Sequence, residues 1–215
     1  MFRGQRHYSG WYWSSTMGHH VVYESRLELA RLLLADMDST VDGVVGQPML
    51  LAGRDGKQFR RHVPDYLLLS RDGSARLVDV KPSDRLADPK VVAQFRWTRE
   101  LCRAKGWGFE VWSGCDPLVM ANVRLLAGFR RAAFVDPDAA AMVTAGVGTG
   151  ARIEELEAAG SASSAPEAIR AAVLHLLWRG LLTADLKVAL NRSTFVRPIP
   201  GSDLAAAHEG TQVNG

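Results

Sequence analysis

The pattern of hydrophobic and polar positions in the first half of the chain predicts alternating helices and strands. Apolar residues recur every three or four positions over residues 22–35, as on one face of a helix, and residues 90–105 repeat this pattern before Gly106, a suitable C-cap. Short apolar runs predict strands at residues 44–51, 64–69, 75–80 and 109–112. This order predicts an α/β fold with a mixed sheet flanked by helices.

The stretch HVPDYLLLSRDGSARLVDVKP, residues 62–82, holds two of these strands and predicts a hairpin. Asp72-Gly73 between the strands is a strong turn signal, and residues 54–57 predict another turn. Each hairpin strand also carries an acid, Asp65 on the first and Asp79 on the second. A carboxylate is an unusual choice for a strand that packs on a core, so these acids are candidates for chemistry.

The second half of the chain predicts several helices followed by a hairpin. Helices are expected at residues 116–131, 139–147, 152–159 and 166–179, and strands at 181–190 and 194–199. This is the outline of a winged helix. We expect one domain over residues 1–115, beginning with an irregular aromatic arm at 1–20, a helical winged-helix-like domain over 116–200, and a disordered tail at 201–215.

The composition and net charge of the chain exclude few classes of function. The 215 residues carry a net charge of +3, which permits a nucleic-acid partner without requiring one. Cys102 and Cys115 lack the spacing of a zinc site, so free thiols are expected. No apolar run is long enough for a membrane span, and the N-terminus lacks the apolar region of a signal peptide. We therefore expect a cytoplasmic protein without a membrane partner.

The charged residues of the hairpin favour a divalent metal. Asp79 and Lys81 lie on one face of their strand, about 7 Å apart along the backbone, and pairing at about 5 Å can bring Asp65 beside Asp79. Two close carboxylates repel each other unless a cation joins them, and Mg²⁺ takes one or two protein carboxylates. An acid from the nearby helix, Glu24 or Glu28, would complete the site. The alternative is a solvated strand face with a weak ion pair.

A wider set of motifs resembles a known family. Tyr23–Glu28 (YESRLE), Gln47-Pro48, His62–Tyr66 (HVPDY) and Val78–Pro82 (VDVKP) follow one another at spacings similar to those of the TnsA-like endonuclease subunits of heteromeric transposases, within the PD-(D/E)xK nuclease superfamily. The resemblance covers about residues 10–113. It implies a restriction-endonuclease-like fold for the first domain.

The resemblance also implies roles for individual residues. The family glutamate follows Ser-x-Leu, which selects Glu28 over Glu24, and Asp65, Asp79 and Lys81 take the other catalytic positions. Glu28, Asp65, Asp79 and the Val80 carbonyl would bind Mg²⁺, for which Mn²⁺ substitutes, and Lys81 would position the attacking water. The implied substrate is double-stranded DNA, cut on the 5′ side of transposon ends. The implied partners are an RNase-H-like transposase subunit and an AAA+ ATPase regulator.

The sequence leaves several alternatives open. The chain is also compatible with a stand-alone PD-(D/E)xK nuclease of phage, repair or restriction type, or with a non-catalytic DNA-binding assembly subunit. Gln47 is either part of an edge strand or a residue that orients the site. The run Arg60-Arg61-His62 is either a solvated edge or a phosphate contact, and no residue is assigned to DNA binding.

Overall fold

The computed structural model describes residues 8–202 and divides the chain into two compact units, Met1–Cys115 and Asp116–Gly215. The first unit is built around a four-stranded mixed sheet of order β3-β6-β7-β8. Its strands are β3 (Val41–Gly46), β6 (Tyr66–Ser70), β7 (Ala75–Val80) and β8 (Gly108–Trp112). The first three are antiparallel neighbours, and β8 is parallel to β7.

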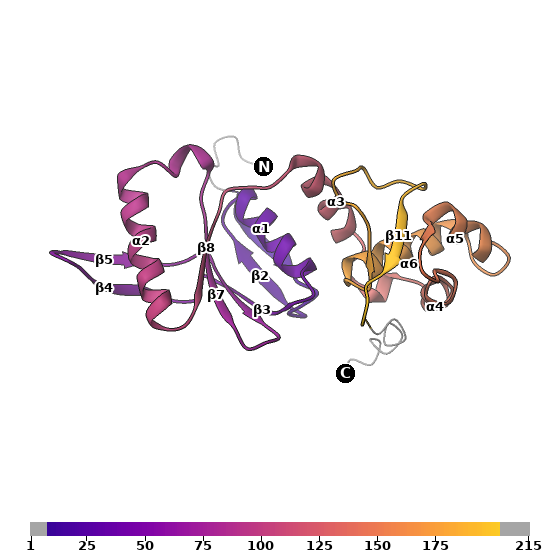
Figure 1. The fold of residues 1–215 in the computed structure, drawn as a ribbon, viewed down its shortest axis with the longest axis horizontal. Helices are drawn as coiled ribbons and strands as arrows, with labels where there is room; N and C mark the ends of the chain where they lie inside the picture. Colours follow the sequence, from indigo (N-terminus) through magenta and orange to yellow (C-terminus); the bar gives the residue numbers. More distant parts are fainter. Residues whose placement is uncertain (1–7, 203–215) are drawn as a thin grey trace. The chain divides into compact units, whose positions relative to one another are not determined.

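Helices α1 (Arg26–Met37) and α2 (Pro89–Ala104) lie on opposite sides of this sheet (Figure 1). Helix α2, with the short 3₁₀ turn η1 (Ser83–Arg85) before it, forms the crossover that parallel strands require. The core between these layers is made of fully buried side chains, among them Leu32, Val44, Tyr66, Leu77 and Val78. This arrangement confirms the predicted α/β class and its restriction-endonuclease-like mixed sheet.

Local sequence signals explain where these elements begin and end. Helix α2 starts with Asp88, whose side chain accepts a hydrogen bond from the Lys90 amide, followed by Pro89 in the first turn. It stops before Gly106, whose φ of 71° is one that glycine adopts without strain. The β6–β7 turn uses Gly73 at φ 81° in the same way, as the Asp72-Gly73 signal predicted.

The N-terminal segment differs from its prediction. Residues 10–20, expected to be irregular, and residues 22–23, expected to begin a helix, belong to an antiparallel hairpin of β1 (Gly10–Trp13) and β2 (His20–Tyr23). The buried carboxylate of Asp36, near the end of α1, accepts hydrogen bonds from the Tyr12 and Ser14 hydroxyls at 2.6 and 2.5 Å and from the Thr16 amide at 2.8 Å. This buried acid holds the loop of the hairpin in place, a long-range contact that local patterning could not reveal. Residues 1–7 of the predicted arm lie outside the described residues.

The predicted strand over residues 44–51 is also wrong. Strand β3 ends at Gly46, and Gln47 takes a left-handed backbone with φ 47° that turns the chain out of the sheet. The chain then forms a separate two-stranded antiparallel ribbon of β4 (Leu51–Asp55) and β5 (Gln58–His62). This β4–β5 ribbon extends past α2 (Figure 1), and only its turn was predicted from the sequence.

The second unit consists of helices and a small three-stranded antiparallel sheet of order β10-β11-β9. Its elements in order are α3 (Pro117–Ala127), the 3₁₀ turn η2 (Ala132–Phe134), α4 (Pro137–Gly146), β9 (Ala151–Arg152), α5 (Ile153–Gly160), α6 (Pro166–Trp178), β10 (Leu182–Thr183) and β11 (Phe195–Pro198). Helix α6 packs against α3, α4 and α5, and its side chains from Ala172 to Trp178 are all buried. The winged-helix interpretation of this unit stays a prediction.

The predicted strand at residues 181–190 shrinks to the two residues of β10. The Asn122 side chain on α3 donates hydrogen bonds to the carbonyls of Leu186 and Val188 and accepts one from the Leu190 amide. These three bonds hold the segment as a loop rather than a strand. Residues 203–215 of the predicted tail lie outside the described part of the chain. Among the described residues, no helix has the length and apolar character needed to cross a bilayer.

Candidate active site

Asp65 immediately precedes β6 and is hydrogen-bonded through its backbone to the segments on either side. Its amide donates a hydrogen bond to the Val78 carbonyl at 3.1 Å, and its carbonyl accepts one from the Gln47 amide at 2.9 Å. Continuing the β6–β7 register by one pair places Asp65 opposite Asp79. The backbone of the candidate site is therefore fixed on both sides by the sheet.

The Asp65 carboxyl group has an unusual electrostatic environment. Burial raises its pKa to about 6, against the effect of the Val80 amide, which donates to Oδ2 at 2.6 Å. The negative charges of Glu28 and Asp79 raise this pKa further, and the ammonium group of Lys81 lowers it. The charges of Glu28, Asp79 and Lys81 therefore lie close enough to Asp65 to act on its carboxyl group.

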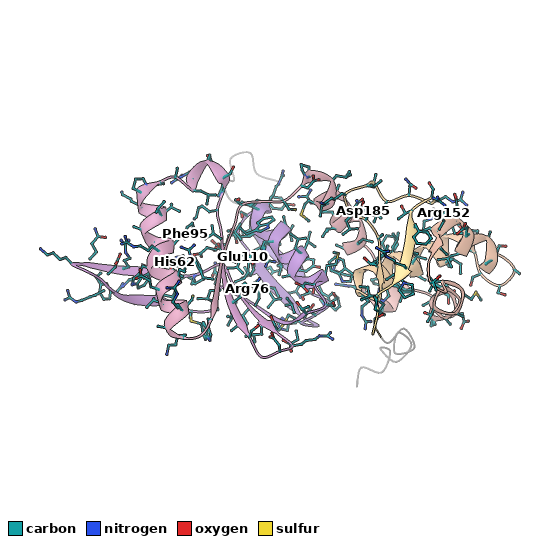
Figure 2. The ribbon with its side chains drawn as sticks, viewed as in Figure 1. His62, Arg76, Phe95, Glu110, Arg152 and Asp185 are labelled. Carbon is teal, nitrogen blue, oxygen red and sulfur yellow. The ribbon has the colours of Figure 1, made fainter. Side chains whose placement is uncertain are left out.

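Asp79 on β7 is almost fully buried and has one strong partner, His62. The His62 Nε2 atom lies 2.7 and 2.8 Å from the two carboxylate oxygens, and only 2% of Asp79 is exposed. His62 ends β5 and lies between the ribbon and the central sheet (Figure 2). This contact differs from the solvated edge that was one alternative for His62, and the phosphate contact stays a prediction. The contact of His62 with Asp79 was not predicted from the sequence, where its only local signal was the place of His62 three residues before Asp65.

Glu28 lies in the first turn of α1, where its carboxylate takes part in the helix cap. Its Oε1 accepts a hydrogen bond from the Ser25 hydroxyl at 2.8 Å, and its Oε2 accepts one from the Glu24 amide at 2.7 Å. The Ser25 hydroxyl in turn accepts from the Glu28 amide. Glu24 is exposed, as expected for a surface residue, and accepts a hydrogen bond from the Gln47 side chain at 2.7 Å. The cap thus fixes Glu28 near Asp65 while using both of its oxygens.

Lys81 follows the end of β7 and is half-buried. Its amide donates to the Trp112 carbonyl at 2.9 Å, which extends the β7–β8 pairing by one residue and fixes the backbone below the side chain. The Val80 amide is the group that binds Asp65, and a ligand role for the Val80 carbonyl stays a prediction.

The donor set fits a hydrated divalent cation better than a closed cage of protein ligands. Among residues 8–202 no three His, Cys, Asp or Glu side chains are gathered as a ready-made metal site. However, Asp65 is a partly buried acid that a cation would relieve, and the Tyr66 hydroxyl beside it is buried with no hydrogen-bond partner among the described residues. Mg²⁺ retains several waters and needs only one or two carboxylates, which Asp65 and Asp79 can supply.

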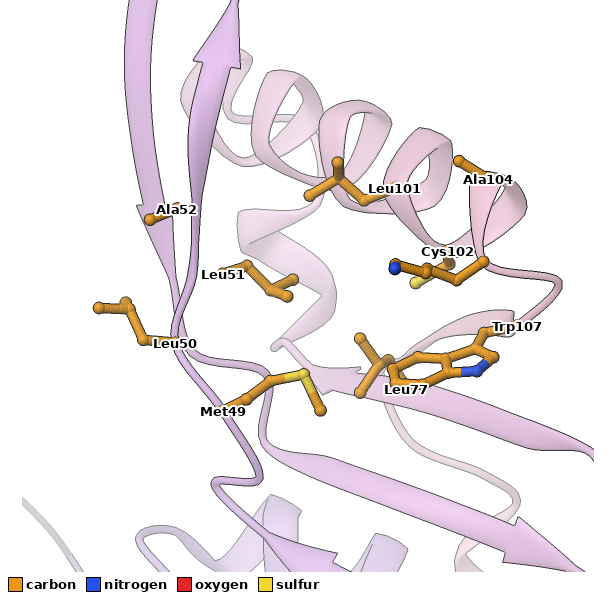
Figure 3. A pocket seen from close by; sticks show the side chains of 10 residues that line it. Met49, Leu50, Leu51, Ala52, Leu77, Leu101, Cys102, Ala104 and Trp107 are labelled. Carbon is orange, nitrogen blue, oxygen red and sulfur yellow. The ribbon is translucent and has the colours of Figure 1, made fainter.

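A separate pocket of about 330 Å³ lies between the start of the ribbon, β7 and α2 (Figure 3). Its wall is apolar, with Met49, Leu51, Leu77, Leu101 and Trp107 among the lining residues, and Lys105 is the only charged residue of the described chain that lines it. The buried thiol of Cys102 also faces this pocket. No acid or histidine lines the pocket, so the candidate chemistry lies outside it.

The first unit is similar to one family of known proteins. Residues 41–114 match the family model described as TnsA-like endonuclease N terminal. The matched segment runs from the start of β3 to just beyond β8, and it contains Asp65, Asp79 and Lys81 but not Glu28. Among curated proteins, none matches the chain. The family match confirms the predicted resemblance: residues 41–114 are similar to the N-terminal domain of TnsA-like endonucleases.

Proposed function

We propose that this chain is the DNA endonuclease subunit of a cut-and-paste transposase. It hydrolyses phosphodiester bonds on the 5′ side of transposon ends, with Mg²⁺ as its cofactor and Mn²⁺ as a substitute. Its partners are an RNase-H-like transposase subunit, which processes the 3′ ends, and an AAA+ ATPase regulator. The family match over residues 41–114 supports the nuclease class and the DNA substrate.

The observation that carries this proposal is the charge arrangement around Asp65. A carboxyl group with a pKa near 6, flanked by the charges of Glu28, Asp79 and Lys81, is costly for the fold and suited to a cation. When bound, Mg²⁺ polarises a phosphoryl oxygen and lowers the pKa of a coordinated water. Asp65 and Asp79 hold the cation, and the Lys81 ammonium offsets the negative charge that develops on the phosphoryl oxygens.

Nicking of supercoiled plasmid carrying transposon ends, with the partner subunits present, tests the proposal. Asp65→Asn and Lys81→Ala should each reduce strand cleavage by at least about 100-fold, since each removes a charge from the reacting centre. Asp72→Asn is the matched control because Asp72 is an exposed acid in the turn of the same hairpin. Full cleavage by either site variant, with the fold intact, would refute the assigned site.

The second unit is proposed to bind partner proteins rather than read DNA bases. Helix α6 would be the recognition helix of a winged helix, yet its side chains from Ala172 to Trp178 are buried. It therefore offers no basic face to a DNA groove. Removing the residues after Cys115 should weaken association with the transposase subunit in pull-down assays. Complete transposition by the truncated chain would contradict this role.

A second candidate function, a non-catalytic assembly subunit, draws on one specific observation. The Asp79 carboxylate is held by His62, and both oxygens of Glu28 are used by the helix cap. If that state persists in the assembled complex, DNA would bind without being cut. Transposition that proceeds normally with Asp65→Asn would favour this candidate, whereas nicking by the chain alone would favour a stand-alone nuclease.

A further inference from the structure

The β4–β5 ribbon has one face fixed to the body of its unit. Asp55 accepts a hydrogen bond from Arg60 across the ribbon at 2.6 Å and pairs with Arg96 of α2 at 3.6 Å. At the base of the ribbon, His62 binds Asp79. A Cβ atom built at Gly53 would lie 3.5 Å from the Trp97 ring, so the backbone here passes close to α2. These contacts orient the ribbon and define its inner face.

The opposite face of the ribbon, its outer face, is exposed and positively charged. Ala52 pairs with Arg61 and Arg54 pairs with Phe59, and all four residues are exposed, as is Lys57 in the turn. Among the described residues no carboxylate forms an ion pair with Arg54, Lys57 or Arg61, since the only acid of the ribbon, Asp55, belongs to the inner face. The outer face and its turn thus carry three cations without a counter-charge.

An aromatic side chain lies among these cations. Phe59 is 63% exposed, and the Arg61 guanidinium lies 5.8 Å from the centroid of its ring. A large apolar side chain held out in water contributes nothing to the core of the unit. Its position beside Arg54 and Arg61 combines an apolar contact with phosphate-binding charges on one narrow surface.

We propose that the outer face of the β4–β5 ribbon binds double-stranded DNA beside the phosphodiester that is cut. This inference rests on the proposed nuclease function for its choice of partner. A two-stranded ribbon has the width of a DNA groove, and Arg54, Lys57 and Arg61 supply the cations that contact phosphates. Phe59 packs against the sugar or base edges between them.

The number of residues between the ribbon and Asp65 limits how far from the cut this DNA contact can lie. Phe59 precedes Asp65 by six residues, which span at most about 20 Å when extended. At 3.4 Å per base pair, Phe59 contacts DNA within about six base pairs of the cut. Because its charges bind phosphates, this contact positions the duplex without selecting a sequence.

The composition of the outer face favours DNA over a protein partner. The buried centre of a protein interface is depleted of charged residues and enriched in aromatic and aliphatic ones. On the outer face the apolar residues are Phe59 and Ala52, set among three cations. A surface of this kind gains most of its binding energy from releasing the counterions of DNA.

The test is the salt dependence of duplex binding by the full chain. Fluorescence anisotropy with a labelled 40-base-pair duplex, in EDTA so that no strand is cut, gives the slope of log K against log salt. In the variant Arg54→Gln/Lys57→Gln/Arg61→Gln this slope should become less negative by about 2.7, and binding should weaken about 500-fold at 0.1 M salt, because three phosphate contacts are lost. Phe59→Ala should weaken binding about 10-fold with no change in slope.

A control variant matches the change in net charge. Arg71→Gln/Arg103→Gln/Lys105→Gln removes three exposed cations outside the ribbon and should leave the slope within about 0.5 of the wild-type value. A ribbon variant with the wild-type slope, or one that loses only its association with the transposase subunit, overturns the inference. Binding is measured without cleavage, so this failure is distinct from failure of the proposed function, which Asp65→Asn and Lys81→Ala test separately.

Discussion

The contact between His62 and Asp79 leads to the sharpest prediction. Asp79 is 2% exposed, and the His62 Nε2 atom lies within 2.8 Å of both of its oxygens. A hydrogen bond to a charged group contributes about 1.5–3 kcal/mol, and removing one partner leaves the other buried and unsatisfied. His62→Ala should therefore lower the free energy of unfolding of the first unit by about 2–3 kcal/mol in EDTA.

Urea unfolding followed by tryptophan fluorescence measures this loss, since every tryptophan except Trp178 belongs to the first unit. A double-mutant cycle with Asp79→Asn isolates the pair and should give a coupling energy of at least about 1.5 kcal/mol. A coupling energy below about 0.5 kcal/mol would refute the argument that His62 satisfies the buried carboxylate.

The same variant reports on the proposed cofactor. In His62→Ala the Asp79 carboxylate lacks its donor, so a divalent cation that binds there should restore part of the lost stability. At a Mg²⁺ concentration ten times its dissociation constant, this gain is about 1.4 kcal/mol. The double variant His62→Ala/Asp79→Asn should not respond. Equal stabilisation of both variants by Mg²⁺ would show that the cation binds elsewhere.

Three further predictions concern other buried polar groups. Because the folded-state pKa of Asp65 is raised to about 6, its charge destabilises the metal-free fold above that pH, and the penalty disappears as the pH falls toward 4. Asp65→Asn should therefore stabilise the first unit by about 2–3 kcal/mol at pH 7.5 and by nearly nothing at pH 4, as measured by urea unfolding in EDTA. Burial alone would raise the pKa of Glu157, but the hydrogen bonds from Arg170 and Arg192 outweigh it and lower the pKa. The stability that this acid contributes is present above its ordinary pKa and is lost as the pH falls through the lowered value. The stability of the second unit should therefore depend less on pH in the acid range in Glu157→Gln than in the wild type, as followed by near-UV circular dichroism. Tyr66→Phe removes a buried hydroxyl that has no partner among the described residues, so it should raise stability by about 1 kcal/mol, and a calorimetric loss of stability instead would show that the hydroxyl is satisfied.

Local sequence signals were sufficient to predict the β6–β7 hairpin and helix α2, which follows it. The Asp72-Gly73 turn fixed the register that places Asp65 opposite Asp79, and the apolar stripe of α2 with Gly106 fixed the helix. The choice of Glu28 and the catalytic position of Lys81 came instead from the resemblance to TnsA-like endonucleases. The hairpin and the helix depend on neighbours in the sequence, which is why periodicity and turn chemistry predicted them.

The features that sequence reasoning missed depend on contacts between distant segments. The β4–β5 ribbon does not alternate apolar and polar residues, since Arg54 and Phe59 lie on its outer face. The loop after β10 is held by Asn122, more than 60 residues earlier in the chain. The partner of Asp79 could not be predicted because His62 reaches it only after the ribbon has folded back onto the sheet.

The hydrogen bond from the Gln47 amide to the Asp65 carbonyl closes the base of the whole excursion that contains the ribbon. Both ends of this excursion are anchored at the sheet, so its length can change without altering how β3 and β6 pair. Ribbons of other lengths grafted between Leu51 and Arg61 should therefore change where the outer face lies while Asp65 and Asp79 stay in place, provided that His62, which binds Asp79, is kept.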